Sequence, residues 1–158
     1  MMIPSRILVT RHAEKPDDPM NPDLSDAGYV RAERLAGYIP ATFGRPEFLF
    51  ATALSTHSAR PVETLTPLSK QIGVAIDSTF ADQDYRALAE EVLSQPQFTG
   101  KLIVICWHHG NIPSLMRALR AKSDGFPDPW DPQVFNLILQ LDYAGSSDPN
   151  MVSVIEPF

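Results

Sequence analysis

The chain has 158 residues, of which 44% are hydrophobic and 20% charged, so it is long enough for one domain with a full core and short for two. We therefore expect residues 1–158 to form one domain. Thirteen Lys and Arg against 19 Asp and Glu give a net charge of -6, which argues against a nucleic-acid partner.

Three further absences in the sequence narrow the class of protein. No apolar run approaches the roughly 20 residues of a membrane-spanning helix, and residues 1–4 lack the pattern of a signal peptide. We therefore expect a cytoplasmic protein that does not enter a membrane. A single cysteine, Cys106, excludes an internal disulfide and a multi-cysteine metal site.

Hydrophobic periodicity predicts strands and helices that alternate along the chain. Short apolar runs indicate strands at residues 7–9, 48–50, 74–76, 102–106, 134–141 and 151–155. Amphipathic spacing and capping residues indicate helices at residues 26–39, 61–72, 85–93 and 113–121, the first of them ending before Pro40. Parallel strands need crossover connections, so this order predicts an α/β fold, a three-layer αβα sandwich around a mostly parallel sheet.

Arginines and histidines follow the predicted strands. Ligands of such folds bind beyond the carboxyl ends of the strands. Arg11 and His12 follow the first strand, Arg60 ends the loop after the second, and His108 and His109 follow the strand at 102–106. We expect these side chains to meet at one edge of the sheet.

The chemistry of these residue types favours a phosphoryl group as the ligand. Guanidinium groups bind phosphate oxygens at two points and keep their charge. At an effective dielectric constant near 20, each cation about 4 Å from a phosphoryl charge contributes roughly 4 kcal/mol of gross attraction, so a local pair of arginines outweighs the acidic net charge. A neutral imidazole with one nitrogen held by a hydrogen bond can attack phosphorus with the other, without a metal.

Four motifs resemble those of the histidine phosphatase superfamily, the phosphoglycerate mutase-like proteins. The resemblance covers residues 6 to about 120, in the order of the family. The matching segments are Thr10-Arg11-His12-Ala13-Glu14, Leu24-Ser25-Asp26-Ala27-Gly28, Arg60-Pro61-Val62-Glu63-Thr64 and the segment from Val104 to Pro113. Alanine stands in the place of the usual glycine at Ala13, and the sequence Arg-His-Ala-Glu-Lys at 11–15 resembles a recognisable short branch of the family.

The resemblance implies specific roles for matching residues. His12 would be the phosphorylated nucleophile, and Arg11, Arg60 and His108 would form the phosphate pocket. No cofactor or metal is implied. The proton donor of the family is a glutamate after the third strand, where this chain offers only aspartates. The candidates are therefore Asp82, Asp84 and Glu14, with His109 as a further possibility.

The length of one segment indicates how open the pocket is, and so which substrates can reach it. The residues between Thr64 and His108 leave little room for the insertion that caps the site of glycolytic mutases. An open pocket suits a phosphatase that acts on an exposed phosphoryl group, either a phosphoester of a small molecule or a phosphohistidine on a protein.

Two other functions compete with the phosphatase. The four histidines His12, His57, His108 and His109 could ligate a metal in a hydrolase, although their spacing matches no helical His-Glu-x-x-His motif and nearby arginines would repel a cation. Alternatively, Ala13 and the missing glutamate could mark a phosphate-binding module without turnover. Retention of both His12 and His108 argues against that module.

Overall fold

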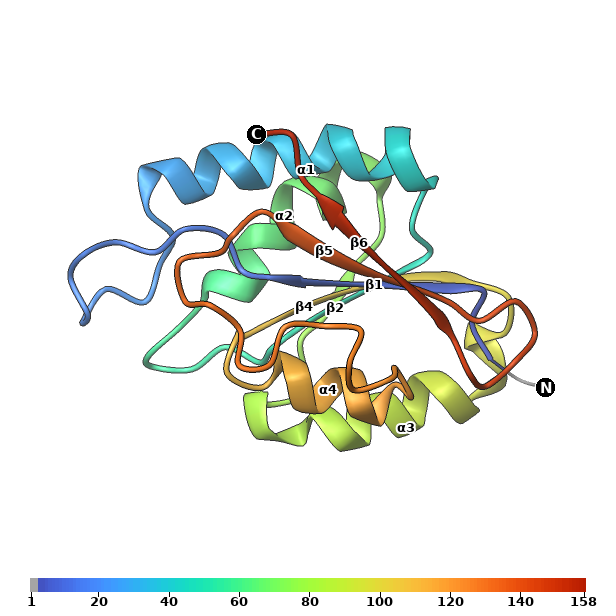
Figure 1. The fold of residues 1–158 in the computed structure, drawn as a ribbon. Coiled ribbons are helices and arrows are strands. Elements are labelled where there is room, and N and C mark those ends of the chain that lie inside the picture. The colour runs from blue at the N-terminus through green and yellow to red at the C-terminus, as the bar shows by residue number, and fades with distance from the viewer. Residues whose placement is uncertain (1–2) are drawn as a thin grey trace.

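The computed structural model describes residues 3–158, which form a six-stranded sheet with helices on both faces. The strands are β1 (Arg6–Arg11), β2 (Phe48–Ala51), β3 (Ile76–Asp77), β4 (Leu102–Trp107), β5 (Leu137–Asp142) and β6 (Asn150–Ile155). The helices are α1 (Asp26–Phe43), α2 (Arg60–Ile72), α3 (Tyr85–Ser94) and α4 (Ile112–Ala118), with 3-10 turns η1 (Asp82–Asp84) and η2 (Pro96–Phe98). Figure 1 shows α1 and α2 on one face of the sheet and α3 and α4 on the other, which confirms the predicted three-layer αβα sandwich.

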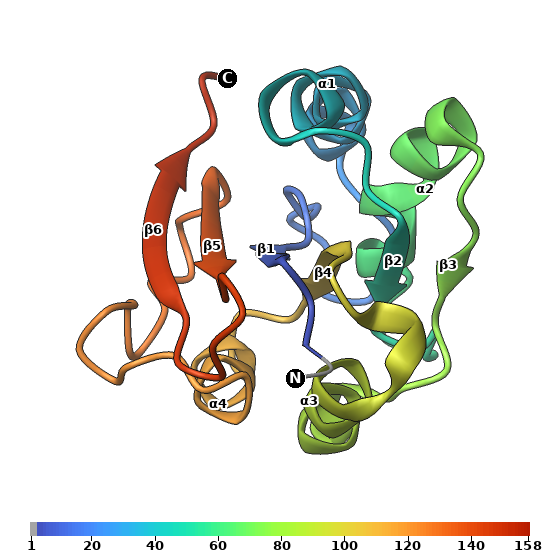
Figure 2. The ribbon, with the colours of Figure 1, turned by 90° about the vertical axis from the view of Figure 1, so that its right-hand side faces the viewer.

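The strand order across the sheet is β3-β2-β4-β1-β5-β6. The first four strands are parallel to one another, whereas β5 runs antiparallel to both β1 and β6. Figure 2, turned by 90° from Figure 1, shows β1 and β4 between the two helical layers. The mostly parallel sheet of the prediction is confirmed, with the two closing strands as its antiparallel part.

Burial on both faces explains the continuous apolar character of the central strands. All six residues of β4 are buried, as are five of the six in β1. Alternation along β1 sends Ile7 and Val9 into a core that contains residues of α3 and α4, and sends Leu8 into a core that contains residues of α1 and α2.

Two predicted boundaries are wrong for identifiable reasons. Helix α1 continues through Pro40 to Phe43, because a proline removes one hydrogen bond near the helix end but permits helical dihedrals after it. Strand β5 begins at Leu137 rather than at 134, because the carbonyl of Val134 accepts hydrogen bonds from Arg11 and Trp130 instead of pairing in the sheet. The other predicted ends agree with the structure to within three residues, and several coincide with it.

The register between β1 and β4 positions the two predicted catalytic histidines. Arg11, the last residue of β1, pairs with Trp107, the last residue of β4. His12 and His108 each follow one residue later and therefore leave the sheet side by side at its carboxyl edge. No helix formed by residues 3–158 combines the length and apolar character needed to cross a bilayer.

Gly28 brings α1 against the loop that follows β1. A Cβ at Gly28 would lie 2.3 Å from the backbone oxygen of Glu14, whereas a Cβ at Gly37 of the same helix would meet nothing within 4 Å. We predict that Gly28→Ala lowers the free energy of unfolding by about 3 kcal/mol.

The matched control is Gly37→Ala, which should raise that free energy by roughly 0.5–1 kcal/mol because alanine favours a helix over glycine. Urea titration of both variants measures the difference. Equal effects of the two substitutions would show that α1 is not held this closely by the loop.

Candidate active site

A cavity of about 630 Å³ opens at the carboxyl edge of the sheet. The four predicted pocket residues Arg11, His12, Arg60 and His108 all line it, and so does Asp82. Arg11 ends β1, and the other four follow the carboxyl ends of β1, β2, β3 and β4. The expectation that these side chains meet at one edge agrees with the structure.

The His12 ring is held through one nitrogen. Its Nδ1 lies 2.6 Å from the carbonyl oxygen of Ala13. A carbonyl oxygen only accepts, so Nδ1 carries the proton, and in a neutral ring Nε2 keeps its lone pair. Burial lowers the pKa of His12 to about 3, and Arg11, His108 and Arg60 add to the effect while the Ala13 hydrogen bond opposes it. His12 is therefore neutral at physiological pH, which is the protonation state in which an imidazole nitrogen has a lone pair available for attack.

His108 lies beside His12 in the cavity. The two ring centroids are 5.4 Å apart with an interplanar angle of 70°. Burial lowers the pKa of His108, and Arg60 and Arg11 lower it further, while Asp82 raises it. Two neighbouring histidines and two arginines thus surround a small space, and both rings favour the neutral form.

The guanidinium of Arg11 is fixed by the loop before β5. Its Nη1 donates to the carbonyl oxygens of Pro132 at 2.7 Å and Val134 at 3.3 Å, and its Cζ lies 3.9 Å from the ring centroid of Phe135. Burial, and then repulsion from Arg60, lowers the pKa of Arg11 to about 10, so the group stays charged at neutral pH. Its Nε and Nη2 are buried without a hydrogen-bond partner.

Arg60 begins α2 and connects that helix to the β1 loop. Its Nη1 donates to the Asn21 carbonyl oxygen at 2.9 Å, and its Nε is buried without a partner. Its own carbonyl accepts from the hydroxyl of Thr64, and the Thr64 hydroxyl oxygen accepts from the backbone N–H of Ala13. Arg60 and His12 therefore stand on elements that are bonded to each other.

Of the three candidate proton donors, the structure brings only Asp82 to the cavity. Its Oδ1 is buried without a partner, and its backbone oxygen accepts from Trp107 Nε1 at 3.0 Å. Asp84 is exposed and does not line the cavity. Glu14 lies apart, because both of its carboxylate oxygens accept from Arg31, at 2.8 and 3.0 Å.

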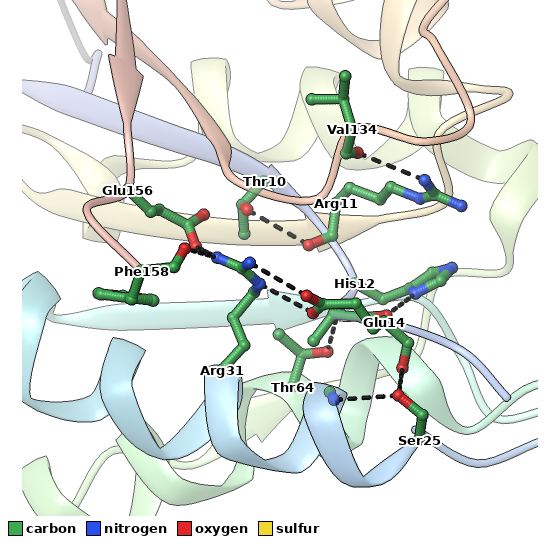
Figure 3. A network of polar contacts seen from close by, with 12 residues as sticks. Thr10, Arg11, His12, Glu14, Ser25, Arg31, Thr64, Val134, Glu156 and Phe158 are labelled. Atoms are coloured by element: carbon green, nitrogen blue, oxygen red, sulfur yellow. Dashed lines mark hydrogen bonds and ion pairs between the residues drawn. The ribbon is translucent and has the colours of Figure 1, made fainter.

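Arg31 joins Glu14 to the end of the chain (Figure 3). Its Nη1 donates to Glu156 Oε1 and to the backbone oxygen of Phe158, both at 2.8 Å. The Glu156 side chain is wholly buried, and its Oε2 has no partner. Burial raises the pKa of Glu156 to about 7, against the opposing effect of Arg31. This network supports the loop after His12 from the side away from the cavity.

Ala13 fits the loop without entering the cavity. Its methyl group is fully buried in a small apolar cluster with Leu24 and Ala32, and it does not line the cavity. Its backbone N–H donates to Thr64 Oγ1 at 2.9 Å. The replacement of the family's glycine therefore leaves space for a ligand.

Other residues line the cavity beside the expected pocket of Arg11, Arg60 and His108 around His12. Thr52, directly after β2, belongs to no motif, and Lys15 ends the Arg-His-Ala-Glu-Lys segment without an expected role. His57 and His109, both named above as possible metal ligands and His109 also as a possible proton donor, line the cavity too. Burial lowers the pKa of His109, with Arg11 and Lys15 contributing. Cys106 is fully buried in the core, which raises its pKa, as expected of an unreactive thiol.

Together, these groups can accommodate a tetrahedral oxyanion. Buried guanidinium nitrogens without hydrogen-bond partners require an acceptor, and Arg11 and Arg60 together have three such nitrogens. A phosphoryl dianion supplies several acceptor oxygens and offsets the repulsion between the two cations. The neutral His12 ring lines the same cavity.

No family profile and no curated protein matches the sequence, but solved structures do. A protein of Agrobacterium tumefaciens, provisionally assigned as the phosphohistidine phosphatase SixA, matches with a TM-score of 0.67 and 16% identity over 96% of this chain and 99% of that chain. A mycobacterial glucosyl-3-phosphoglycerate phosphatase matches with a TM-score of 0.63 and 16% identity over 98% and 97%. A phosphoglycerate mutase of Plasmodium falciparum matches with a TM-score of 0.58 and 13% identity over 97% and 89%.

This chain has the phosphoglycerate mutase-like fold. The segment between Thr64 and His108 consists of the rest of α2, β3, α3, β4, the two 3-10 turns and short connections between them. It therefore contains no separate insertion over the cavity, as its length predicts.

The buried carboxyl group of Glu156 should make the free energy of unfolding depend on pH. Its pKa is raised from 4.5 to about 7 by folding, so between these values the folded state binds the proton that the unfolded state has lost. The wild-type protein therefore loses stability from this group as pH rises through that window. Relative to wild type, Glu156→Gln should gain roughly 2–3 kcal/mol of unfolding free energy between pH 4.5 and 7.5.

Urea titrations at several pH values measure that difference. Glu33→Gln is the matched control, because Glu33 is exposed on α1 and should show no such trend. A stability difference between Glu156→Gln and wild type that stays constant with pH would contradict the buried, proton-binding state of Glu156.

Proposed function

We propose that this chain is a member of the histidine phosphatase superfamily and a metal-independent phosphatase, which hydrolyses a phosphoester or a phosphohistidine through a phosphohistidine intermediate on His12. The observation that carries the proposal is the His12 ring. Its Nδ1 is held by the Ala13 carbonyl, its low pKa keeps it neutral, and it lines a cavity with the unpartnered N–H groups of Arg11 and Arg60.

The first half of the reaction transfers the phosphoryl group to the protein. His12 Nε2 attacks phosphorus, and the bond from phosphorus to the leaving oxygen or nitrogen breaks. Arg11, Arg60 and His108 stabilise the charge on the transferring group by hydrogen bonds. The leaving atom takes a proton from Asp82 when that carboxyl is protonated.

The second half returns the protein to its starting state. Water attacks phosphorus, the bond from Nε2 to phosphorus breaks, and the carboxylate of Asp82 accepts the proton that the water loses. Inorganic phosphate leaves, and His12 is again neutral with its proton on Nδ1.

The comparisons support the class of ligand. The mycobacterial phosphatase structure contains inorganic phosphate, and a SixA protein histidine phosphatase with a TM-score of 0.61 and 12% identity contains tungstate. Both ligands are tetrahedral oxyanions of the kind that this cavity suits. The match to a phosphoglycerate mutase, of which 89% is covered, means that short length alone does not separate a phosphatase from a mutase. We favour the phosphatase because no insertion closes the cavity.

Hydrolysis of p-nitrophenyl phosphate and of a phosphohistidine protein, with and without EDTA, tests the proposal. We expect phosphate release that EDTA does not reduce, and a loss of at least about 10³-fold in His12→Ala. His57→Ala, which removes an exposed histidine from the rim of the cavity, should retain most of the activity.

Other outcomes would identify the competing functions. Among residues 3–158, no three His, Cys, Asp or Glu side chains gather as a metal-ligating group. Loss of activity in EDTA would nevertheless establish the metal-dependent hydrolase. Phosphoryl transfer to an added hydroxy acid as fast as transfer to water would establish a mutase, and oxyanion binding without turnover would establish a binding module.

Two variants decide between the aspartates after β3. Asp82→Asn should lower kcat by about 10²-fold or more on an alkyl phosphate, whose leaving oxygen needs a proton, and by less on p-nitrophenyl phosphate. Asp84→Asn should leave both rates close to wild type, because Asp84 is exposed and outside the cavity. The assignment of Asp82 fails if the two substitutions have equal effects or if its effect does not depend on the leaving group.

A further inference from the structure

Three threonines are buried among residues 3–158, and they differ in one respect. The hydroxyl of Thr10 lies within 3.5 Å of the carbonyl oxygens of Arg11 and Leu137, and the hydroxyl of Thr64 donates to one backbone group and accepts from another. Thr52 is only 2% exposed, and its Oγ1 has no hydrogen-bond partner.

Thr52 is fixed at the carboxyl edge of the sheet. It directly follows β2, and its backbone N–H donates to the carbonyl oxygen of Cys106 at 3.3 Å, which extends the pairing of β2 with β4 by one residue. The residue lines the cavity that Arg11, His12 and Arg60 also line. Its position is therefore set by the sheet rather than by a flexible loop.

A buried hydroxyl without a partner destabilises the folded state. Three guanidinium nitrogens of residues that line the same cavity share this condition, namely Nε and Nη2 of Arg11 and Nε of Arg60. Guanidinium groups can only donate, so these three cannot satisfy one another. One group with several acceptor oxygens satisfies the three N–H groups and a donating hydroxyl together.

We propose that Thr52 is a direct ligand of the phosphoryl group and donates its hydroxyl proton to a phosphoryl oxygen. This proposal rests on the function proposed above and adds a fourth residue to the expected pocket of Arg11, Arg60 and His108. A neutral donor suits this position, because Arg11 and Arg60 already repel each other, and a further cation would add to that repulsion.

Titration calorimetry with inorganic phosphate and with orthovanadate tests the proposal. Thr52→Val removes the hydroxyl with little change of shape, and we expect it to weaken the binding of both anions about tenfold or more, as for a lost hydrogen bond to a charged group. Thr52→Ser keeps the hydroxyl and should bind within a small factor of wild type. The matched control is Thr66→Val, at a threonine on α2 whose hydroxyl bonds the Val62 carbonyl away from the cavity.

Thermal unfolding without an anion separates a ligand from a structural residue. Because the Thr52 hydroxyl has no partner in the folded protein, Thr52→Val should keep or raise Tm while it weakens anion binding. A purely structural role would lower Tm and affinity together. That result, or binding by Thr52→Val within twofold of wild type, would overturn the proposal.

The wild-type titration distinguishes failure of the phosphatase function from failure of the role of Thr52. If the wild-type protein binds neither anion, the phosphatase function fails, and the role of Thr52 fails with it. If wild type binds and hydrolyses but Thr52→Val binds equally well, only the role of Thr52 is wrong.

Discussion

The hydrogen bond from His12 Nδ1 to the Ala13 carbonyl is the interaction on which the proposed chemistry depends. It assigns the proton to one nitrogen and leaves the other free, and burial keeps the ring neutral. The carbonyl can serve this purpose because its own peptide is fixed: the N–H of Ala13 bonds Thr64, and the methyl group packs into an apolar cluster. The orientation of one imidazole is thus set by the packing of the loop on α2.

The distribution of charge resolves the contrast between an acidic chain and an anionic ligand. Arg11 and Arg60 line the cavity and have buried nitrogens without a hydrogen-bond acceptor. Burial, and then repulsion from Arg60, lowers the pKa of Arg11. Asp82 is the one carboxylate among the described residues that lines this cavity. Glu14, although only two residues after His12, is neutralised by Arg31 on the other side of the loop. The acidic excess of the sequence therefore does not oppose a phosphoryl group.

The sequence predicts the layers of the fold and the four central site residues because these depend on local signals. Buried strands read as apolar runs, and Arg11, His12, Arg60 and His108 follow them within recognisable motifs. The position of Glu14 outside the cavity could not be predicted. Its partner Arg31 also bonds Glu156, which is 125 residues away from Arg31 in the sequence. Thr52 carries no charge and no motif, and only the absence of a partner in the folded protein marks it. The start of β5 depends on hydrogen bonds from Arg11 and Trp130 to Val134, which no local pattern encodes.

The most direct test of the account is to trap the intermediate. Protein mixed with a ³²P-labelled substrate and quenched in alkali within milliseconds should carry phosphate that is stable to alkali and labile to acid, and mass spectrometry should locate it on His12. Label on another residue, or hydrolysis at full rate with no labelled protein at any time, would contradict the assignment of His12 as the nucleophile.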